Sequence, residues 1–184
     1  MCYKKLITDH FAGDIIIQRH VKGSGGDFAK YWSDYKYGFG SEGGNYYWVG
    51  LDTIHGITSS GSYSLEINLK SGGQTKTVTY SSFSVENESN NYRLLVSGFN
   101  AGSSGLRDSL NYHNGKVFST RDKDNDGYSG SCSSRVGGNS GWWFDYCRWS
   151  NLNFGDSGGP EWYYNRFDES TMIVIFFHPI VISK

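Results

Sequence analysis

The stretch with the most distinctive chemistry is FSTRDKDNDGYSGSC, in which Asp122, Asp124 and Asp126 alternate with other residues ahead of Gly127. Carboxylate and carbonyl oxygens on a tightly curved backbone are the ligands that Ca²⁺ prefers. An EF-hand loop that began at Asp122 would need a bidentate Glu where this chain has Ser133, so the pattern is not an EF-hand. The stretch indicates either another type of calcium loop or a solvated acidic turn.

A second stretch, NFGDSGGPEW, contains the letters GDSGGP that surround the nucleophilic serine of chymotrypsin-like proteases, with Ser157 in the place of the nucleophile. Such a serine needs a histidine base, a buried aspartate and an oxyanion hole. None of the five histidines stands in the Ala-Ala-His-Cys setting of that base, and the chain after Ser157 is too short for a second β-barrel. The stretch therefore predicts a surface turn, and the protein is not expected to be an enzyme.

Length and charge narrow the class of protein. A chain of 184 residues is large enough for one domain with a substantial core. The net charge of −1, with both signs interspersed, does not indicate a nucleic-acid or acidic-membrane partner. The run MIVIFFHPIVI, interrupted by His178 and Pro179, is shorter than the ~20 residues of a bilayer span and predicts a buried strand. MCYKKLITDH, the first stretch, does not resemble a signal peptide.

The composition is rich in glycine and aromatic residues, with 25 Gly, 2 Pro and 17% Phe, Trp and Tyr. Glycines allow tight irregular loops, and aromatic side chains bury a large area per residue. This combination is typical of secreted recognition domains and not of helical cytosolic enzymes.

The chain has three cysteines. Cys132 and Cys147 flank a Gly- and Ser-rich loop without a zinc spacing, which favours a disulfide that stabilises the fold by about 3 kcal/mol and implies an oxidising compartment. Cys2 is left over, either free, bonded to another chain or lacking its partner in this sequence. The sequon that begins at Asn87 is consistent with secretion.

Alternation and turn residues predict the regular elements. Phe28, Tyr31, Trp32 and Tyr35 lie at helical spacing and predict a helix that ends at Gly38. NYYWVGLDTIHGIT predicts a strand followed by a short helical turn. Strands are expected in GDIIIQRH, as a central strand, and in YSLEINL, TKTVTYSSFSV and NYRLLVSGF, whereas the second half of the chain predicts mostly loops.

Four segments, WSDYKYGFG, YYWVGLDTIHGIT, DSLNYHNGKVFSTRDKDND and GWWFDYCRWSNLN, occur in an order and spacing that resemble the fibrinogen C-terminal domain. Fibrinogen chains, ficolins, tachylectins, angiopoietins and tenascins share this domain, and the resemblance covers nearly the whole chain. It implies an α+β fold over residues 1–184: a central, mostly antiparallel twisted sheet, few short helices, and a loop-rich calcium and ligand region at about residues 100–170. The N-terminal subdomain is expected to be shortened.

The resemblance also implies a calcium site and a disulfide. The family's calcium ligands correspond to the carboxylates of Asp124 and Asp126 and the carbonyls of Tyr128 and Gly130, with Asp122 outside the set. The family's disulfide corresponds to Cys132–Cys147. Its ligand pocket is built around a cis peptide that would be Tyr146–Cys147.

In the family's lectins this pocket encloses an N-acetyl group, and this sequence departs from their pattern. Arg148 replaces a histidine and could favour a carboxylate or sulfate, or could be a solvated charge. Trp149 could stack on a sugar or fill the core. An aromatic residue is replaced by Val136 or Gly138, and the shortened loop places Asp156 and Ser157 at the rim. The residues expected to bind ligand are therefore Tyr146, Cys147, Arg148, Trp149, Val136, Asp156 and Ser157.

The resulting expectation is a secreted, calcium-binding lectin for N-acetylated or acidic glycans on microbial or cell surfaces in innate immunity, without membrane insertion and with homo-oligomers for avidity. The alternative is a module that binds a protein or receptor and has no affinity for glycans. His55 and His113 are expected to be packed and hydrogen-bonded, and Trp142 and Trp143 to fill the core beneath the disulfide loop.

Overall fold

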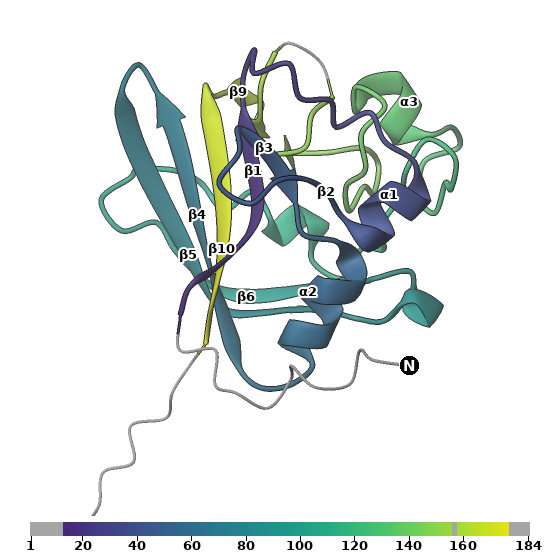
Figure 1. Ribbon diagram of the computed structural model, residues 1–184, viewed down its shortest axis with the longest axis horizontal. Helices are drawn as coiled ribbons and strands as arrows, with labels where there is room; N and C mark the ends of the chain where they lie inside the picture. Colours follow the sequence, from purple (N-terminus) through teal and green to yellow (C-terminus); the bar gives the residue numbers. More distant parts are fainter. Residues whose placement is uncertain (1–12, 156–157, 177–184) are drawn as a thin grey trace, which may run out of the picture.

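The computed structural model describes residues 13–155 and 158–176 and contains a seven-stranded antiparallel sheet in the order β2-β3-β1-β10-β4-β5-β6 (Figure 1). A small second sheet has the order β7-β8-β9. The strands are β1 Ile15–Val21, β2 Phe39–Gly40, β3 Tyr46–Trp48, β4 Tyr63–Ser71, β5 Gln74–Val85, β6 Leu94–Asn100, β7 Ser150–Asn151, β8 Glu161–Trp162, β9 Asn165–Arg166 and β10 Glu169–Phe176. The helices are α1 Trp32–Tyr37, α2 Leu51–Thr58 and α3 Cys132–Val136, with 3-10 turns η1 Glu88–Asn90 and η2 Asn111–His113.

Alternating apolar residues create the buried face of the sheet. Leu65, Ile67 and Leu69 of β4 are fully buried, whereas the residues between them are partly exposed, as expected for a strand with one face on the core. The same alternation buries Met172 and Val174 in β10. The strands predicted from the sequence are confirmed, including β1 in the sheet interior between β3 and β10. Residues 177–182 of the apolar run lie outside the described residues.

Helix α1 is shorter than predicted because it begins only at Trp32. Tyr31 has an extended backbone whose N–H donates to Asp34 Oδ2 at 3.0 Å, and the N–H of Trp32 donates to Asp122 Oδ1 at 2.9 Å. A side chain distant in sequence therefore fixes the helix start. The end at Gly38 is as predicted, since φ there is 97° and a Cβ would lie 2.7 Å from the Val49 carbonyl oxygen.

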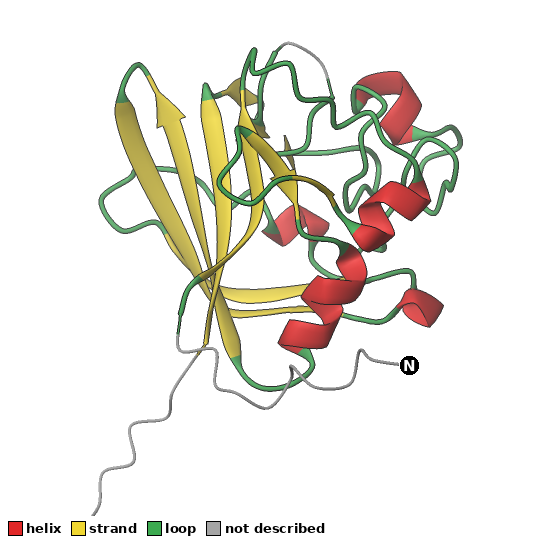
Figure 2. Cartoon of the chain, viewed as in Figure 1, coloured by secondary structure: helices red, strands yellow, loops and turns green. Residues whose placement is uncertain are grey.

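The second half of the chain is mostly loops, as predicted, and most of these loops lie with the helices on one side of the large sheet (Figure 2). They are held by buried aromatic rings: the ring of Trp143 lies 5.1 Å from that of Phe118 and 5.2 Å from that of Trp142. Trp142 and Trp143 are fully buried, which confirms their place in the core. Large aromatic side chains supply the packing that regular backbone structure does not.

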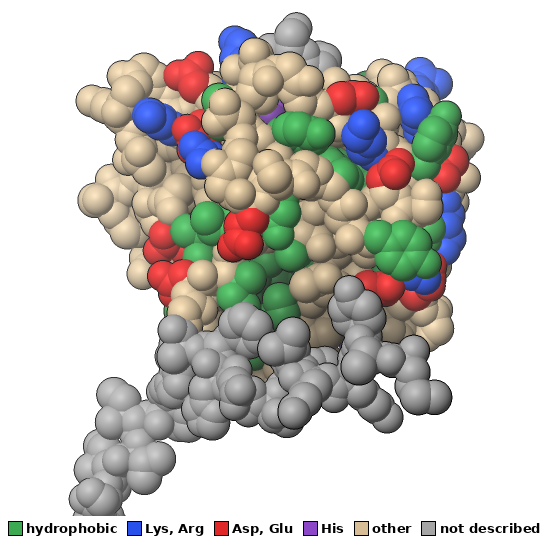
Figure 3. All heavy atoms as spheres, in the orientation of Figure 1, with side chains coloured by type: hydrophobic (Ala, Val, Ile, Leu, Met, Phe, Trp, Pro, Cys, Tyr) green, Lys and Arg blue, Asp and Glu red, His purple; other side chains and the backbone are tan. Residues whose placement is uncertain are grey.

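Charged side chains of both signs are interspersed on the face shown in Figure 3, in agreement with the near-neutral composition. Within residues 13–155 and 158–176, no helix is both long and apolar enough to span a bilayer.

Candidate ligand and calcium site

The predicted disulfide is present between Cys132 and Cys147, whose Cα atoms lie 5.0 Å apart. Helix α3 begins at Cys132, and the side chain of Ser131 caps it by accepting the N–H of Ser134 at 3.3 Å. The disulfide thus joins the start of α3 to the segment that carries most of the predicted ligand residues.

The expected cis peptide at Tyr146–Cys147 is wrong for this structure, because no peptide bond in residues 13–155 and 158–176 is cis. The chain reverses here by another means: Cys147 has a φ of 72°, and the N–H of Asp145 donates to the carbonyl of Cys147 at 3.1 Å. This tight reversal presents the Tyr146 side chain to solvent, with 72% of its surface exposed.

Asp124 and Asp126, the predicted calcium ligands, lie in one turn. The N–H of Asp126 donates to Asp124 Oδ1 at 3.2 Å. The Asp126 carboxylate accepts the N–H groups of Tyr128 at 2.9 Å and Cys132 at 2.8 Å. The acidic turn is therefore anchored to the first residue of α3.

The electrostatics of this turn suit a cation. Burial raises the pKa of Asp126, the backbone N–H groups of Cys132 and Tyr128 lower it, and the neighbouring Asp124 raises it again. Among the described residues no Lys, Arg or His forms an ion pair with either carboxylate. Bound Ca²⁺ would remove the repulsion between the two carboxylates.

The donor set fits calcium if carbonyl oxygens complete it. The described part of the chain contains no group of three His, Cys, Asp or Glu side chains that could hold a metal. Asp122 is engaged elsewhere, since its Oδ1 accepts the Thr120 hydroxyl at 2.7 Å as well as the Trp32 N–H. The carboxylates that remain for a cation are those of Asp124 and Asp126, so carbonyl oxygens would have to complete a calcium site.

The acidic turn packs directly against the segment before Cys147. The N–H of Gly127 donates to the carbonyl of Asp145 at 3.2 Å, and a Cβ on Gly127 would lie 2.7 Å from Asp145 Oδ1. Lys116 Nζ holds the same aspartate at 2.9 Å from Oδ2. A change in the conformation of the acidic turn would therefore be transmitted through Asp145 to the residues that follow it.

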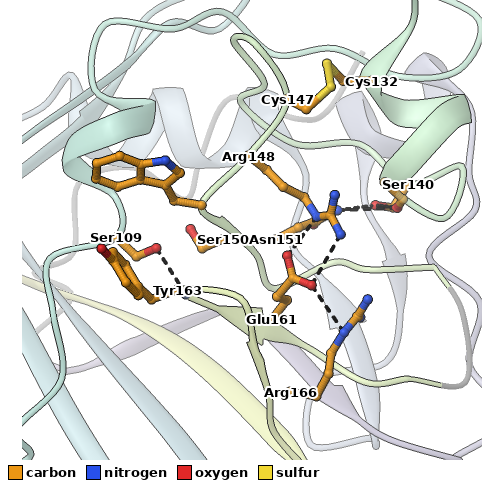
Figure 4. Close-up of polar contacts among 12 residues, drawn as sticks. Ser109, Cys132, Ser140, Cys147, Arg148, Ser150, Asn151, Glu161, Tyr163 and Arg166 are labelled. Atoms are coloured by element: carbon orange, nitrogen blue, oxygen red, sulfur yellow. Dashed lines mark hydrogen bonds and ion pairs between the residues drawn. A yellow bond between two sulfur atoms is a disulfide. The ribbon is translucent and has the colours of Figure 1, made fainter.

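Arg148 is neither a free anion-binding group nor a solvated charge (Figure 4). Its Nε lies 2.8 Å from Glu161 Oε1, and its Nη2 donates to Glu161 Oε2 at 3.2 Å. The two side chains are only 16% and 6% exposed. Arg166 approaches the same carboxylate, with Nε 3.2 Å from Oε2, and both guanidinium groups lie over the ring of Phe154, at 5.0 Å and 3.5 Å from its centroid. The structure thus uses Arg148 to neutralise a buried carboxylate.

His113 lies behind the ligand segment and is fully buried. Its Nδ1 lies 2.7 Å from the Trp143 carbonyl oxygen, and its Nε2 accepts the N–H groups of Trp149 at 3.3 Å and Ser150 at 3.1 Å. Burial lowers the pKa of His113 to about 4. The neutral ring therefore fixes the backbone of the ligand segment, which confirms that His113 is packed and hydrogen-bonded.

His55 shares this structural role, since its Nδ1 lies 2.9 Å from the Val85 carbonyl oxygen.

Trp149 contacts other side chains than Arg148 does and forms part of an aromatic surface. Its ring stacks on that of Tyr112 at 4.8 Å and 15°, and meets the ring of Tyr163 edge-on at 5.7 Å. Tyr164 extends this surface, 5.7 Å from Tyr163, and is 61% exposed. We call the side chains of Tyr112, Trp149, Tyr163 and Tyr164 the aromatic shelf; of these, only Trp149 is among the residues expected from the sequence.

Arg107 lies at the border of the aromatic shelf. Its guanidinium carbon is 5.0 Å from the Tyr163 ring centroid, and its Nη1 donates to the Tyr163 hydroxyl at 3.0 Å. The Tyr163 N–H donates to the buried Ser109 hydroxyl at 3.2 Å (Figure 4). The shelf therefore has a cation at its border, and the hydrogen bond to Ser109 fixes the backbone of Tyr163.

Tyr163 and Tyr164 form the two-residue turn between β8 and β9 and have φ angles of 47° and 65°. Hairpin turns with two left-handed residues normally contain Asn or Gly, and the left-handed conformation costs other residues about 1 kcal/mol each. The chain therefore holds two tyrosines in a strained turn, and backbone strain of this kind concentrates at functional sites. In the sequence, the only sign of this turn is the Tyr-Tyr pair itself, and no turn pattern singles it out.

Of the remaining predicted ligand residues, the structure describes Val136, Tyr146 and Cys147. Val136 ends α3 and is 38% exposed. Cys147 is bonded to Cys132. Asp156 and Ser157 lie outside the described residues. Burial raises the pKa of Tyr112, and the nearby backbone N–H of Tyr146 offsets part of this rise, so the exposed Tyr146 lies beside the aromatic shelf.

Comparison with known proteins agrees with this architecture. Tenascin-R from Homo sapiens is 40% identical over 167 residues, which are 88% of this chain and 12% of tenascin-R. Angiopoietin-related protein 6 from Mus musculus is 45% identical over 142 residues, 77% of this chain and 30% of that protein. The chain thus spans only a small part of these relatives.

Solved structures with the same fold include the fibrinogen-like globe domain of human ANGPTL6, with a TM-score of 0.81, 32% identity and coverage of 91% of this chain and 79% of that one. Lamprey fibrin D-dimer, complexed with the peptide ligand Gly-His-Arg-Pro-amide, has a TM-score of 0.77 and 25% identity, with coverage of 92% and 64%.

The family model for the C-terminal globular domain of fibrinogen beta and gamma chains matches residues 3–176. The fold, the disulfide and these similarities agree, and the chain belongs to the fibrinogen C-terminal domain family.

Proposed function

We propose that this chain is a secreted, non-enzymatic recognition domain that binds a partner protein through Tyr146 and the aromatic shelf. The observation that carries the proposal is the exposure of aromatic side chains on a rigid support: Tyr146 is 72% exposed and Tyr164 is 61% exposed. Tyrosine, tryptophan and arginine are the residues most enriched at the energetic centres of protein interfaces. Arg107 adds a cation at the border of this surface.

The support beneath the shelf favours binding because it limits the entropy lost on association. The His113 ring fixes the Trp149 amide, and the Ser109 hydroxyl fixes that of Tyr163. The N–H of Tyr164 donates to the Trp149 carbonyl at 3.3 Å, so two segments of the shelf are joined through their backbones.

The relatives support protein recognition as the class of function. The lamprey fibrin structure contains a peptide ligand, and tenascin-R and angiopoietin-related protein 6 share the domain at 40% and 45% identity. The disulfide supports secretion, because structural disulfides persist in oxidising compartments.

Calcium is the proposed cofactor, and its role is to stabilise the loop. Asp124 and Asp126 would hold it with the carbonyls of Tyr128 and Gly130, and the ion would supply the positive charge that their turn lacks. The contact between Gly127 and Asp145 would transmit the order of this turn to Tyr146.

We propose that the domain is not an enzyme, because the histidines that the structure describes are engaged with backbone groups. The Nδ1 atoms of His20, His55 and His113 all lie within hydrogen-bonding distance of backbone carbonyl oxygens. His113 has both ring nitrogens engaged and its pKa is lowered to about 4. These rings serve as structural ties and not as bases for a serine nucleophile.

Glycan recognition is the second candidate, and the ring of Trp149 favours it because sugars stack on aromatic faces. The proposed ligands are N-acetylated or acidic glycans of microbial or cell surfaces, bound in the context of innate immunity. The engagement of Arg148 with Glu161 weakens the acidic version of this candidate.

Cell-binding assays with an Fc-fused, labelled domain distinguish the two candidates. Cells are treated with trypsin, with a mixture of neuraminidase and endoglycosidases, or with neither, and binding is measured by flow cytometry in calcium. Beads that carry N-acetylated, sialylated and sulfated sugars are tested in parallel, with acetate as competitor.

Binding that trypsin abolishes and glycosidases leave intact, and that Tyr164→Ala and Trp149→Ala reduce, supports protein recognition. Tyr37→Ala is the control, because Tyr37 is 71% exposed on α1 and outside the shelf. Retention on sugar beads that acetate competes away, together with loss of cell binding after glycosidase, would overturn the proposal in favour of the lectin.

A further inference from the structure

Strand β5 extends beyond the strand that pairs with its outer edge. β4 pairs with β5 from Tyr80 to Gln74, but β6 pairs only between Val85 and Thr79, where its Asn100 is the last partner. In the described part of the chain, the segment from Gln74 to Val78 therefore has a strand neighbour on one side only.

The hairpin geometry identifies which backbone groups face the open edge. Gly72 and Gly73, with φ of 56° and 79°, form the two-residue turn between the paired residues Ser71 and Gln74. The residues that flank such a turn bond to each other, and the direction alternates along the strand. Gln74, Lys76 and Val78 thus direct their N–H and C=O groups at β4, whereas Thr75 and Thr77 direct theirs outward.

A groove follows this open edge. One cavity, of about 620 Å³, lies between the segment from Gln74 to Thr79 and the loop from Asn100 to Ser104. A second, of about 440 Å³, also includes Gln74 and Lys76 and continues to Leu106, Arg166 and Phe167. Both cavities are lined mainly by polar residues, which suits the backbone of an extended chain.

The groove has a positive character. Its lining includes Lys76 and, within the described residues, neither Asp nor Glu, whereas Arg166, which also lines it, is already paired with Glu161. Lys76 forms no ion pair with any described residue. An acidic side chain opposite Lys76 would find a partner that the domain itself does not supply.

A second copy of this chain fits the edge poorly. If two copies paired antiparallel so that Thr75 of one bonded to Thr77 of the other, the two Lys76 side chains would lie directly opposite on one face. Like charges at that separation destabilise a strand pair, and lysine on an edge strand is a common means of preventing self-association.

We propose that the open edge at Thr75 and Thr77 binds an extended acidic segment of a partner protein as an added antiparallel strand, with an acidic residue opposite Lys76. Backbone hydrogen bonds would supply affinity, and Lys76 would supply charge selectivity. This surface does not involve the aromatic shelf, so a failure here would leave the proposed function standing.

Amide hydrogen exchange measured by NMR on the whole chain tests this proposal. The probes are two capped peptides, acetyl-Val-Glu-Val-Glu-Val-amide and acetyl-Val-Lys-Val-Lys-Val-amide. We expect the glutamate peptide to slow exchange of the Thr75 and Thr77 amides by about tenfold or more and the lysine peptide to have no effect. Lys76→Glu should reverse this preference.

Thr77→Pro removes the outward N–H and no backbone hydrogen bond to β4, and should abolish the protection, whereas Thr77→Val keeps the N–H and should preserve it. Both variants lose the hydrogen bond from the Thr77 hydroxyl to Asn68 Oδ1 in β4, so the comparison isolates the N–H. Thermal melting of each variant reports whether it is folded. The proposal is overturned if millimolar glutamate peptide protects neither amide, if Lys76→Glu leaves the preference unchanged, or if protection maps to another surface.

Discussion

Arg148 Nε lies 2.8 Å from Glu161 Oε1, so that the residue expected to receive an acidic ligand is already paired with a buried carboxylate. The pair holds Arg148 against a buried residue, whereas the adjacent Trp149 packs on Tyr112 and Tyr163. Two adjacent residues of one segment thereby serve different purposes, one in stability and one on the surface.

Glu161→Gln should destabilise the fold by about 3 kcal/mol, because it leaves Arg148 with a buried and uncompensated charge. Urea denaturation monitored by tryptophan fluorescence measures the change. Glu169→Gln is the matched control: Glu169 pairs with Arg19 at 3.0 Å, but both side chains are more exposed, at 22% and 30%, so a loss of less than about 1 kcal/mol is expected. Equal effects of the two variants would contradict this account of Arg148.

Stability should decrease as the pH falls from 6.5 towards 4 because of His113. Its pKa is lowered from 6.5 to about 4 by burial, so the unfolded chain takes up a proton in this interval before the folded protein does. The contribution is fully present above pH 6.5 and decreases by about 3 kcal/mol as the pH reaches 4. Urea unfolding between pH 7 and 5, where carboxylates titrate little, measures the slope.

His113→Gln should flatten this slope, whereas His55→Gln, at a partly exposed position, is the control and should leave it unchanged. A slope that persists unchanged in His113→Gln would assign the pH dependence to another group.

Calcium should raise the melting temperature of the wild-type protein, and removal with EGTA should reverse the rise. At a concentration of about 100 times Kd the stabilisation is about 2.7 kcal/mol. Asp124→Asn and Asp126→Asn should abolish the response, and Asp122→Asn should retain it, because Asp122 binds the N–H of Trp32 instead. A calcium response in Asp126→Asn would place the site elsewhere.

Tyr164→Gly should separate stability from binding. Glycine adopts a φ of 65° without the steric cost that tyrosine incurs, so the free energy of unfolding should rise by up to about 1 kcal/mol. Binding to trypsin-sensitive sites on cells should fall at the same time. Denaturation and flow cytometry on the same preparation measure both quantities. A variant that is less stable and binds normally would contradict the proposal that the strained turn serves binding.

The parts of the structure that could be predicted from the sequence are those with local or pairwise signals. Leu65, Ile67 and Leu69 alternate and form a strand, and the spacing of Cys132 and Cys147 indicated their bond. The start of α1 could not be predicted, because it depends on Asp122, which is 90 residues away.

The candidate site was only partly predictable for the same physical reason. The sequence singled out Arg148, but its partner Glu161 comes from strand β8, 13 residues away, and no local pattern indicates their pairing. The aromatic shelf combines rings from three separate segments, around Tyr112, Trp149 and Tyr163, and such a combination depends on the path of the loops.

The pairing of β1 with β10 has a consequence for how the domain is mounted. Ile15 lies opposite Val174, so the first described strand begins where the last one ends, at the lower end of the sheet in Figure 1. The hairpin of β8 and β9, with Tyr163 and Tyr164 at its tip, lies at the other end. A tether attached at the end of the sheet where β1 begins and β10 ends would leave the β8–β9 hairpin at the opposite end of the domain. Tyr163 and Tyr164 would then face away from the tether, towards a partner.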